Sequence, residues 1–153
     1  MPTESKLKIL VADDNRMVLA TVCHMLTALA YDVQEAEHGL EALKRFEQEP
    51  FDLVLTDIQM PYMDGWELTR RVKSLVPGMH VIAMTGMSPA EVPASLGKNG
   101  PDRILFKPLR IDEFENAMAM AFAARHLKTA ERERCDVNSF KPVSNRERRL
   151  ADG

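Results

Sequence analysis

The sequence is poor in the features that indicate structural metals, disulfides or membrane spans. Its two cysteines, Cys23 and Cys135, lie far apart and belong to no CxxC pair, which argues against a zinc site or a disulfide framework. No apolar run approaches the ~18 residues of a membrane span, and the first residues lack the apolar core of a signal peptide. We therefore expect a reduced, cytoplasmic protein without a membrane partner.

The chain also lacks a strong excess of either charge. Its 20 basic and 23 acidic residues give a net charge of −3, which does not favour a nucleic-acid surface. The length of 153 residues suits one domain. From residue 129 the sequence turns polar, so we predict one domain over residues 1–128. Residues 129–153 are then predicted to be a tail, disordered or partly helical, with no room for a second domain.

Short apolar runs alternate with helical patterns along the predicted domain. Strands are predicted at 8–12, 31–36, 51–56, 80–84 and 103–106. Helical patterns run from Asn15 to about Leu29, from Gly39 to Gln48, from Asp64 to Leu75, and from Arg110 to about Lys128. Residues 88–102 contain three prolines and two glycines, so any helix there should be short or irregular. This order predicts an α/β fold, a five-stranded parallel sheet with helices on both faces.

Polar residues follow the predicted strands at the edge where such sheets bind ligands. They are three carboxylates, a hydroxyl and an ammonium: Asp13, Asp14, Asp57, Thr85 and Lys107. Clustered carboxylates repel one another and need a cation, and oxygen ligands suit Mg²⁺. A carboxylate beside a metal can attack a phosphoryl group, while Lys107 and Thr85 stabilise its oxygens.

Five segments carry a resemblance to a known family. They read ILVADDNRMV, AEHGLEAL, DLVLTDIQMPYMDGWEL, VIAMTG and ILFKPL. Together they resemble the receiver domain of two-component response regulators, over about residues 6–128. The resemblance implies a flavodoxin-like, doubly wound fold like that of CheY. It also implies a stand-alone phosphorylation switch that signals through contacts with a downstream protein.

The resemblance assigns roles to individual residues. Asp57 would be the phosphoacceptor, with Lys107 and Thr85 in the catalytic set and Thr85 as the switch hydroxyl. Mg²⁺ would be held by Asp13, Asp14, Asp57 and the backbone carbonyl of Gln59. Gln59 and Met87 flank the site and would tune the phosphoryl lifetime. The Lys107–Pro108 bond is expected to be cis.

The resemblance also implies partners. The phosphodonor would be a sensor histidine kinase or a histidine phosphotransfer protein. The chain would catalyse its own Mg²⁺-dependent phosphoryl transfer and hydrolysis without being an enzyme that acts on a metabolite. Weak homodimerisation stays open, because receivers often pair through their fourth and fifth helices and the fourth is irregular here.

One position departs from the family pattern. Receivers usually carry Tyr or Phe three residues before the lysine, and that ring moves with the switch hydroxyl; here the residue is Ile104. Coupling between Thr85 and the output surface through a ring is therefore in question. We hypothesise that signalling instead reorders residues 88–102.

Two alternatives stay open. A phosphatase with an aspartate nucleophile usually has a second aspartate two residues later, where this chain has Gln59. A binding module that no longer needs phosphate would explain Ile104 and the irregular segment, but it would leave the acidic set without a purpose.

Overall fold

A computed structural model describes residues 6–93 and 97–123. Five parallel strands form one sheet in the order β2-β1-β3-β4-β5. They are β1 (Lys8–Ala12), β2 (Asp32–Ala36), β3 (Leu53–Asp57), β4 (Val81–Thr85) and β5 (Arg103–Phe106). The predicted α/β fold is confirmed. The predicted tail, residues 129–153, lies outside the described residues.

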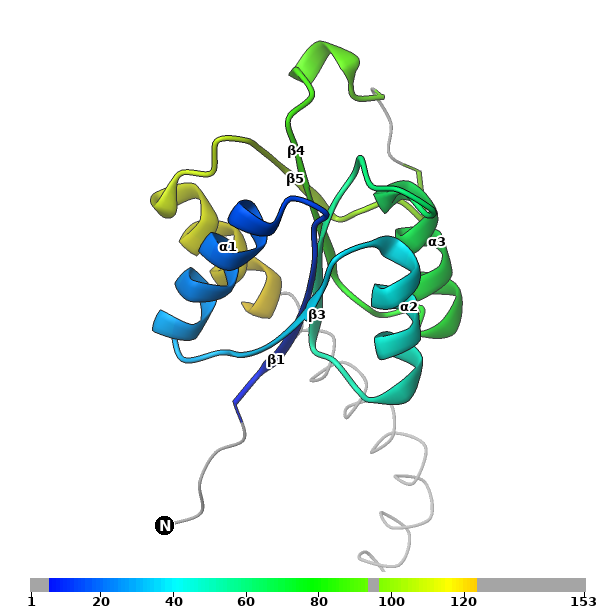
Figure 1. Cartoon of the computed structure of the whole chain (residues 1–153), viewed down its shortest axis with the longest axis horizontal. Helices are drawn as coiled ribbons and strands as arrows, with labels where there is room; N and C mark the ends of the chain where they lie inside the picture. Colours follow the sequence, from blue (N-terminus) through cyan, green and yellow to red (C-terminus); the bar gives the residue numbers. More distant parts are fainter. Residues whose placement is uncertain (1–5, 94–96, 124–153) are drawn as a thin grey trace, which may run out of the picture. The chain divides into compact units, whose positions relative to one another are not determined.

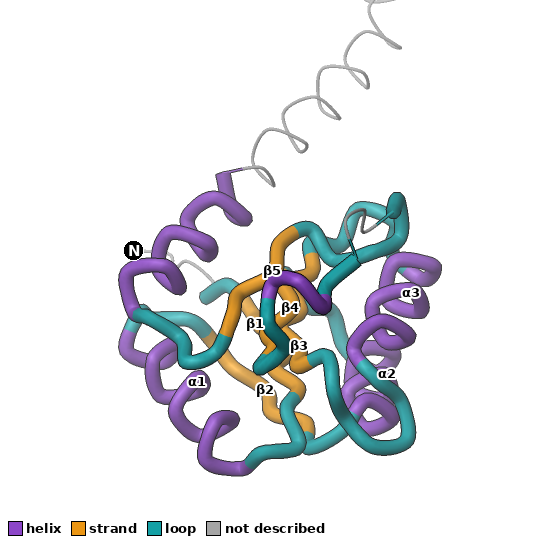
Figure 2. The backbone as a smooth tube through the Cα atoms, turned by 90° about the horizontal axis from the view of Figure 1, so that it is seen from above, coloured by secondary structure: helices purple, strands orange, loops and turns teal. Residues whose placement is uncertain are grey.

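Helices cover both faces of this sheet. They are α1 (Arg16–Ala28), α2 (Gly39–Gln48) and α3 (Gly65–Leu75). Both views place α1 on one face and α2 with α3 on the other (Figures 1 and 2). This arrangement explains the continuous apolar runs, because β1, β3 and β4 are buried on both faces.

Each of α1, α2 and α3 begins after a side chain that accepts a backbone hydrogen bond from its first turn. Asn15 accepts from the backbone N–H groups of Met17 and Val18, as its predicted capping role requires. Asp64 caps α3 through the N–H of Glu67. His38 caps α2, its Nδ1 accepting from the N–H of Glu41. Histidine is an uncommon cap, and the sequence pattern did not indicate it.

The core on the α2 and α3 face joins the sheet to both helices. Phe46 of α2 stacks on Phe51, with ring centroids 6.3 Å apart, and Leu68 and Val72 of α3 are fully buried. Burying side chains of this size contributes about 1.5–3 kcal/mol each. The sheet is thereby fixed, and so are the positions of its strand ends.

The third and fourth strands begin and end one or two residues later than the sequence predicts. The third and fourth were predicted to end at residues 56 and 84, but β3 includes Asp57 and β4 includes Thr85. Ladder hydrogen bonds hold these polar residues in the sheet: the N–H of Ile58 donates to Met84 and the N–H of Lys107 to Thr85. Both side chains are therefore held by the rigid sheet and not by a loop.

The described part of the connection between β4 and β5 holds one short 3₁₀ turn, η1 (Pro89–Glu91). Pro89 opens this turn, and Glu91 accepts a hydrogen bond from the N–H of Ser88 at 2.7 Å. In Figure 1 the turn projects beyond the carboxyl ends of the strands. The prediction of an irregular fourth helix is confirmed for these residues.

The chain divides into two compact units, residues 1–114 and 115–153, and each is described by itself. The first contains the sheet and α1–α3. The second is described to residue 123, and these residues continue a helix that begins at Ile111. The sequence pattern predicts an apolar stripe on this helix: Ile111, Phe114, Met118, Ala121 and Phe122. The last four are buried, whereas Ile111 is 60% exposed. Among the described residues, no helix is long and apolar enough to cross a membrane.

Candidate functional site

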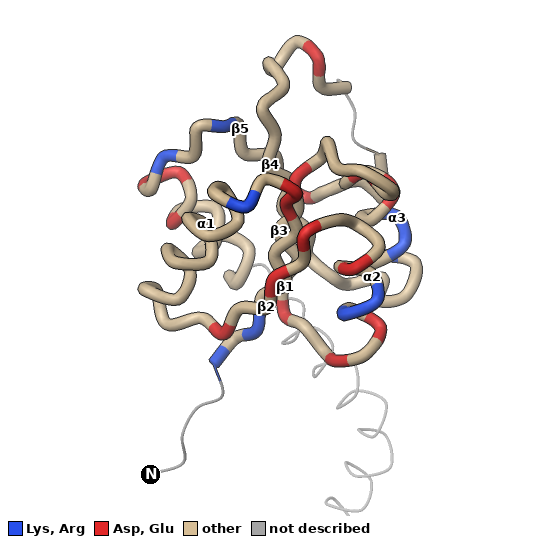
Figure 3. The backbone as a smooth tube through the Cα atoms, viewed as in Figure 1, with Lys and Arg blue, Asp and Glu red and all other residues tan. Residues whose placement is uncertain are grey.

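Three carboxylates meet where β1 and β3 end. Asp13 and Asp14 directly follow β1, and Asp57 is the last residue of β3, which pairs with β1. One oxygen from each carboxylate lies within 4.8 Å of the others. Asp13 is fully buried, Asp57 is 6% exposed, and Asp14 faces solvent. Figure 3 shows acidic segments at this edge of the sheet.

Lys107 brings a positive charge to these acids from β5. Its ammonium lies 2.9 Å from Asp13 Oδ2 and 3.4 Å from Asp57 Oδ1. It stands just beyond β5, before a cis Lys107–Pro108 bond, as expected. The backbone N–H of Asn15 donates to the other oxygen of Asp13 at 2.9 Å. Asp13 is thus held on two sides.

Asp57 lies in an unfavourable place for a negative charge. Burial, followed by the charge of Asp13, raises its pKa from 3.8 to about 6. Lys107 and the N–H of Ile58, which donates to Asp57 Oδ1 at 2.9 Å, oppose this rise without cancelling it. Burial and the neighbouring carboxylate thus outweigh the positive charge of Lys107 at Asp57.

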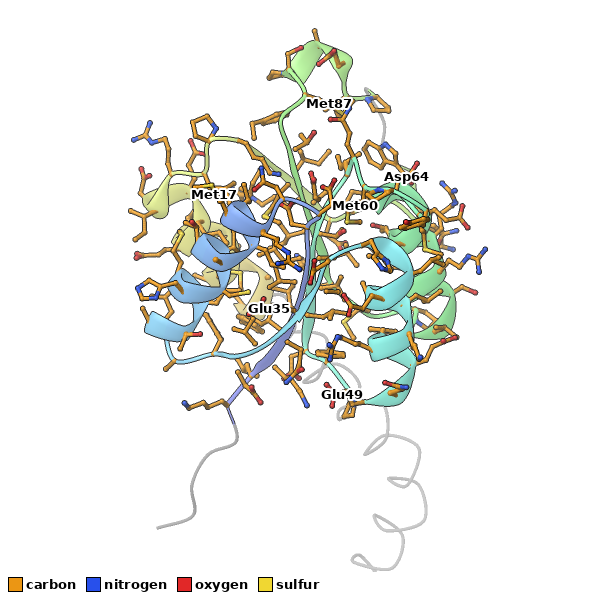
Figure 4. The ribbon with its side chains drawn as sticks, viewed as in Figure 1. Met17, Glu35, Glu49, Met60, Asp64 and Met87 are labelled. Carbon is orange, nitrogen blue, oxygen red and sulfur yellow. The ribbon has the colours of Figure 1, made fainter. Side chains whose placement is uncertain are left out.

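Thr85 ends β4, beside Asp57 on the neighbouring strand, and its side chain is fully buried. Its hydroxyl oxygen accepts a hydrogen bond from the N–H of Met87 at 3.0 Å. Met87 is half-buried and, with Met60, lies at the same end of the sheet (Figure 4). Two predicted site residues are thus linked directly to each other.

The β3–α3 loop (residues 58–64) follows the phosphoacceptor candidate. It is closed by the N–H of Gly65, which donates to the carbonyl of Ile58 at 2.7 Å. A Cβ on Gly65 would lie 2.3 Å from the carbonyl oxygen of Asp57, so only glycine allows this approach. Gln59 lies in this loop with its side chain exposed.

Ile104 stands apart from the acidic cluster. It is half-buried inside β5, where it pairs with Ala83 of β4, two residues before Thr85. The structure therefore brings together Asp13, Asp14, Asp57 and Lys107, with Thr85 beside them, and leaves Ile104 outside.

The donor set fits a hard divalent cation. It consists of oxygens only, one carboxylate is open to solvent, and three carboxylates share the single ammonium of Lys107. Mg²⁺ prefers such ligands and keeps several waters. Asp13, Asp14 and Asp57 would hold it.

The acidic site has a consequence for stability that can be measured without metal. Because the folded protein holds the Asp57 proton more tightly than the unfolded chain does, ionising Asp57 destabilises the fold as pH rises from about 4 to about 6. We expect Asp57→Asn to stabilise the metal-free protein by on the order of 2 kcal/mol above that window, and by almost nothing below it. Urea unfolding in EDTA across the pH range measures this gain, and a gain of equal size at every pH would contradict it.

Comparison with known proteins agrees with this geometry. The family model described as "Response regulator receiver domain" matches residues 9–119. The chain belongs to the response regulator receiver family. The acidic cluster of Asp13, Asp14 and Asp57 lies within the residues that the family model matches.

Two curated relatives show where similar receivers occur. The chain is 34% identical over 125 residues to the sensor protein EvgS of Escherichia coli K12, covering 80% of this chain and 10% of that protein. It is 32% identical over 138 residues to the transcriptional regulatory protein ZraR of Escherichia coli O157:H7, covering 90% and 31%. The chain thus spans a third or less of these relatives.

Solved structures match the receiver over nearly their whole length. A receiver domain protein from Clostridium thermocellum has a TM-score of 0.73 at 29% identity, covering 79% of this chain and 98% of that one. The response regulator TrrA of Thermotoga maritima, solved in complex with Mg²⁺-BeF, has a TM-score of 0.69 at 28% identity, covering 75% and 98%.

Proposed function

We propose that this receiver is a phosphorylation-dependent signalling switch whose phosphoacceptor is Asp57. The observation that carries the proposal is the meeting of Asp57 with Asp13, Asp14 and Lys107 at the end of a buried strand. TrrA, a similar receiver, was solved with Mg²⁺-BeF, which supports the same chemistry here. The receiver does not act on a metabolite.

The phosphodonor is a phosphohistidine on a sensor kinase or phosphotransfer protein. An Asp57 oxygen attacks phosphorus, an O–P bond forms, and the P–N bond to the histidine breaks. The electron pair of that bond stays on the imidazole, which takes up a proton from water. The product is an acyl phosphate on Asp57, which water later hydrolyses to aspartate and phosphate.

This chain's own residues prepare that step. The Asp57 side chain is only slightly exposed, and the sheet holds it in one position. The Lys107 ammonium lies 3.4 Å from Asp57 Oδ1 and can bind the negatively charged phosphoryl oxygens once they are attached to Asp57. The three aspartates and the Gln59 carbonyl would hold Mg²⁺, which would supply further positive charge at the phosphoryl oxygens. Thr85 donates its hydroxyl hydrogen to a phosphoryl oxygen.

A groove beside the site suits the docking of the phosphodonor. It has a volume of about 280 Å³ and lies between α1 and the residues after β5, lined by Met17, Val18, Thr21, Val22, Met25, Lys107, Pro108 and Leu109. Met17 is 81% exposed. An apolar helix face of a partner could lie there while its histidine approaches Asp57.

The experiment is covalent labelling of the purified chain with phosphoramidate or acetyl phosphate in Mg²⁺. We expect one phosphoryl group per chain, located on Asp57 by mass spectrometry, sensitive to hydroxylamine and absent from Asp57→Asn. Beryllofluoride should change the spectrum of wild type only. Labelling that persists in the variant would overturn the assignment, and turnover of phosphoesters would favour the phosphatase.

A further inference from the structure

Tyr62 occupies an unusual place in the β3–α3 loop. It is 80% exposed and has a φ of 69°. The N–H of Met63 donates to the carbonyl of Pro61 at 2.8 Å, so Tyr62 is the central residue of a γ-turn with positive φ, the rarer and more strained form. A bulky residue is costly in this conformation, whereas glycine adopts it freely. Something outside the turn must therefore stabilise tyrosine there.

His38 is the group that contacts this ring. The His38 and Tyr62 rings meet edge to face, with centroids 5.2 Å apart and an interplanar angle of 73°. The same imidazole caps α2, with Nδ1 3.2 Å from the N–H of Glu41. Asn or Asp would cap a helix better, but neither has a ring to offer Tyr62. The uncommon cap is explained if His38 serves both purposes.

The α2 N-terminus also packs on the same loop through its backbone. A Cβ on Gly39 would lie 2.3 Å from the carbonyl oxygen of Met63, and Met63 is buried in the core cluster of this face. The loop is thus held from inside by Met63 and from outside by Tyr62. Both residues lie against the start of α2: Tyr62 against His38 and Met63 against Gly39.

We propose that Tyr62 and His38 form a clamp that positions the β3–α3 loop for metal binding. The inference rests on the proposed function, because that loop carries Gln59, whose carbonyl is an expected metal ligand. A loop held in its bound conformation before the ion arrives loses less freedom on binding. Tyr62 is a positioning residue that acts through the loop and does not touch the reacting atoms.

The test measures Mg²⁺ affinity in four variants by the fluorescence of Trp66, the second residue of α3, which directly follows the β3–α3 loop. Tyr62→Gly removes the ring and suits the γ-turn, and His38→Asn removes the other ring but keeps a helix cap. We expect each of these two variants to weaken Mg²⁺ binding by about three- to tenfold. The double variant should weaken it no more than either single variant does, because both remove the same contact. The control Tyr62→Phe keeps the ring and should weaken binding by less than about twofold. The thermal midpoints should stay close to that of wild type.

A second readout needs neither metal nor activity. Hydrogen exchange of the Met63 amide, which donates across the γ-turn, should speed up in Tyr62→Gly and His38→Asn but not in Tyr62→Phe. Unchanged exchange, or losses of affinity that add in the double variant, would overturn the clamp. If wild type itself takes no label at Asp57, the proposed function fails, while the exchange experiment still decides on the clamp.

Discussion

Replacing Gly65 with alanine should destabilise the receiver by about 3 kcal/mol and lower its thermal midpoint by about 10 °C. The added Cβ would lie 2.3 Å from the Asp57 carbonyl oxygen and 2.8 Å from the Ile58 Cα. Both are backbone atoms of the segment that bears Asp57, the proposed phosphoacceptor, so neither can rotate away. Either α3 or the end of β3 must shift, and we expect labelling of Asp57 to slow as well.

Gly78→Ala is the matched control for this prediction. A Cβ at Gly78 meets nothing within 4 Å, so the same chemical change should leave stability within about 0.5 kcal/mol of wild type. Gly39→Ala, whose Cβ would lie 2.3 Å from Met63, should resemble Gly65→Ala. Urea unfolding of the three variants checks the series. Equal stability of the Gly65 and Gly78 variants would show that the loop accommodates the methyl group.

The sequence predicted the sheet well because buried parallel strands leave a strong signal. After Lys8 the run to Ala12 is apolar without alternation, and β1 has the predicted bounds, Lys8–Ala12. The bounds of β3 and β4 were less accurate, because Asp57 and Thr85 are polar residues that the ladder nevertheless retains. Polarity alone could not show that these two side chains belong to the strands.

The acidic cluster was predictable for a topological reason. The carboxyl ends of parallel strands meet at one edge, so Asp13, Asp14, Asp57 and Lys107 had to lie near one another once the strands were assigned. The contact between His38 and Tyr62 was not predictable, because 24 positions separate them and neither belongs to a motif that specifies the pair. A histidine directly before Gly39, in an N-cap position, was the one available signal.

Removing the positive charge of Lys107 should also change the stability of the receiver strongly. In Mg²⁺-free buffer, Lys107→Met should cost about 3 kcal/mol of stability at neutral pH, because it leaves the buried Asp13 carboxylate with no positive partner. The pKa of Asp57, already raised to about 6 by burial and Asp13, should rise further without Lys107. The folded variant then binds more protons than its unfolded chain, so its deficit should shrink as pH falls.

Lys107→Met could lose stability because a charge is missing or because the aliphatic part of the lysine no longer packs. Two experiments that restore stability distinguish these causes. Asp13→Asn in the Lys107→Met background removes the unpaired charge and should recover most of the stability, since only the isolated buried ion is costly. Mg²⁺ should also stabilise Lys107→Met more than wild type, because the ion replaces the missing charge. Urea unfolding with EDTA or Mg²⁺ gives both comparisons. If neither change restores stability, Lys107 acts through packing, and the charge balance inferred for the acidic edge is wrong.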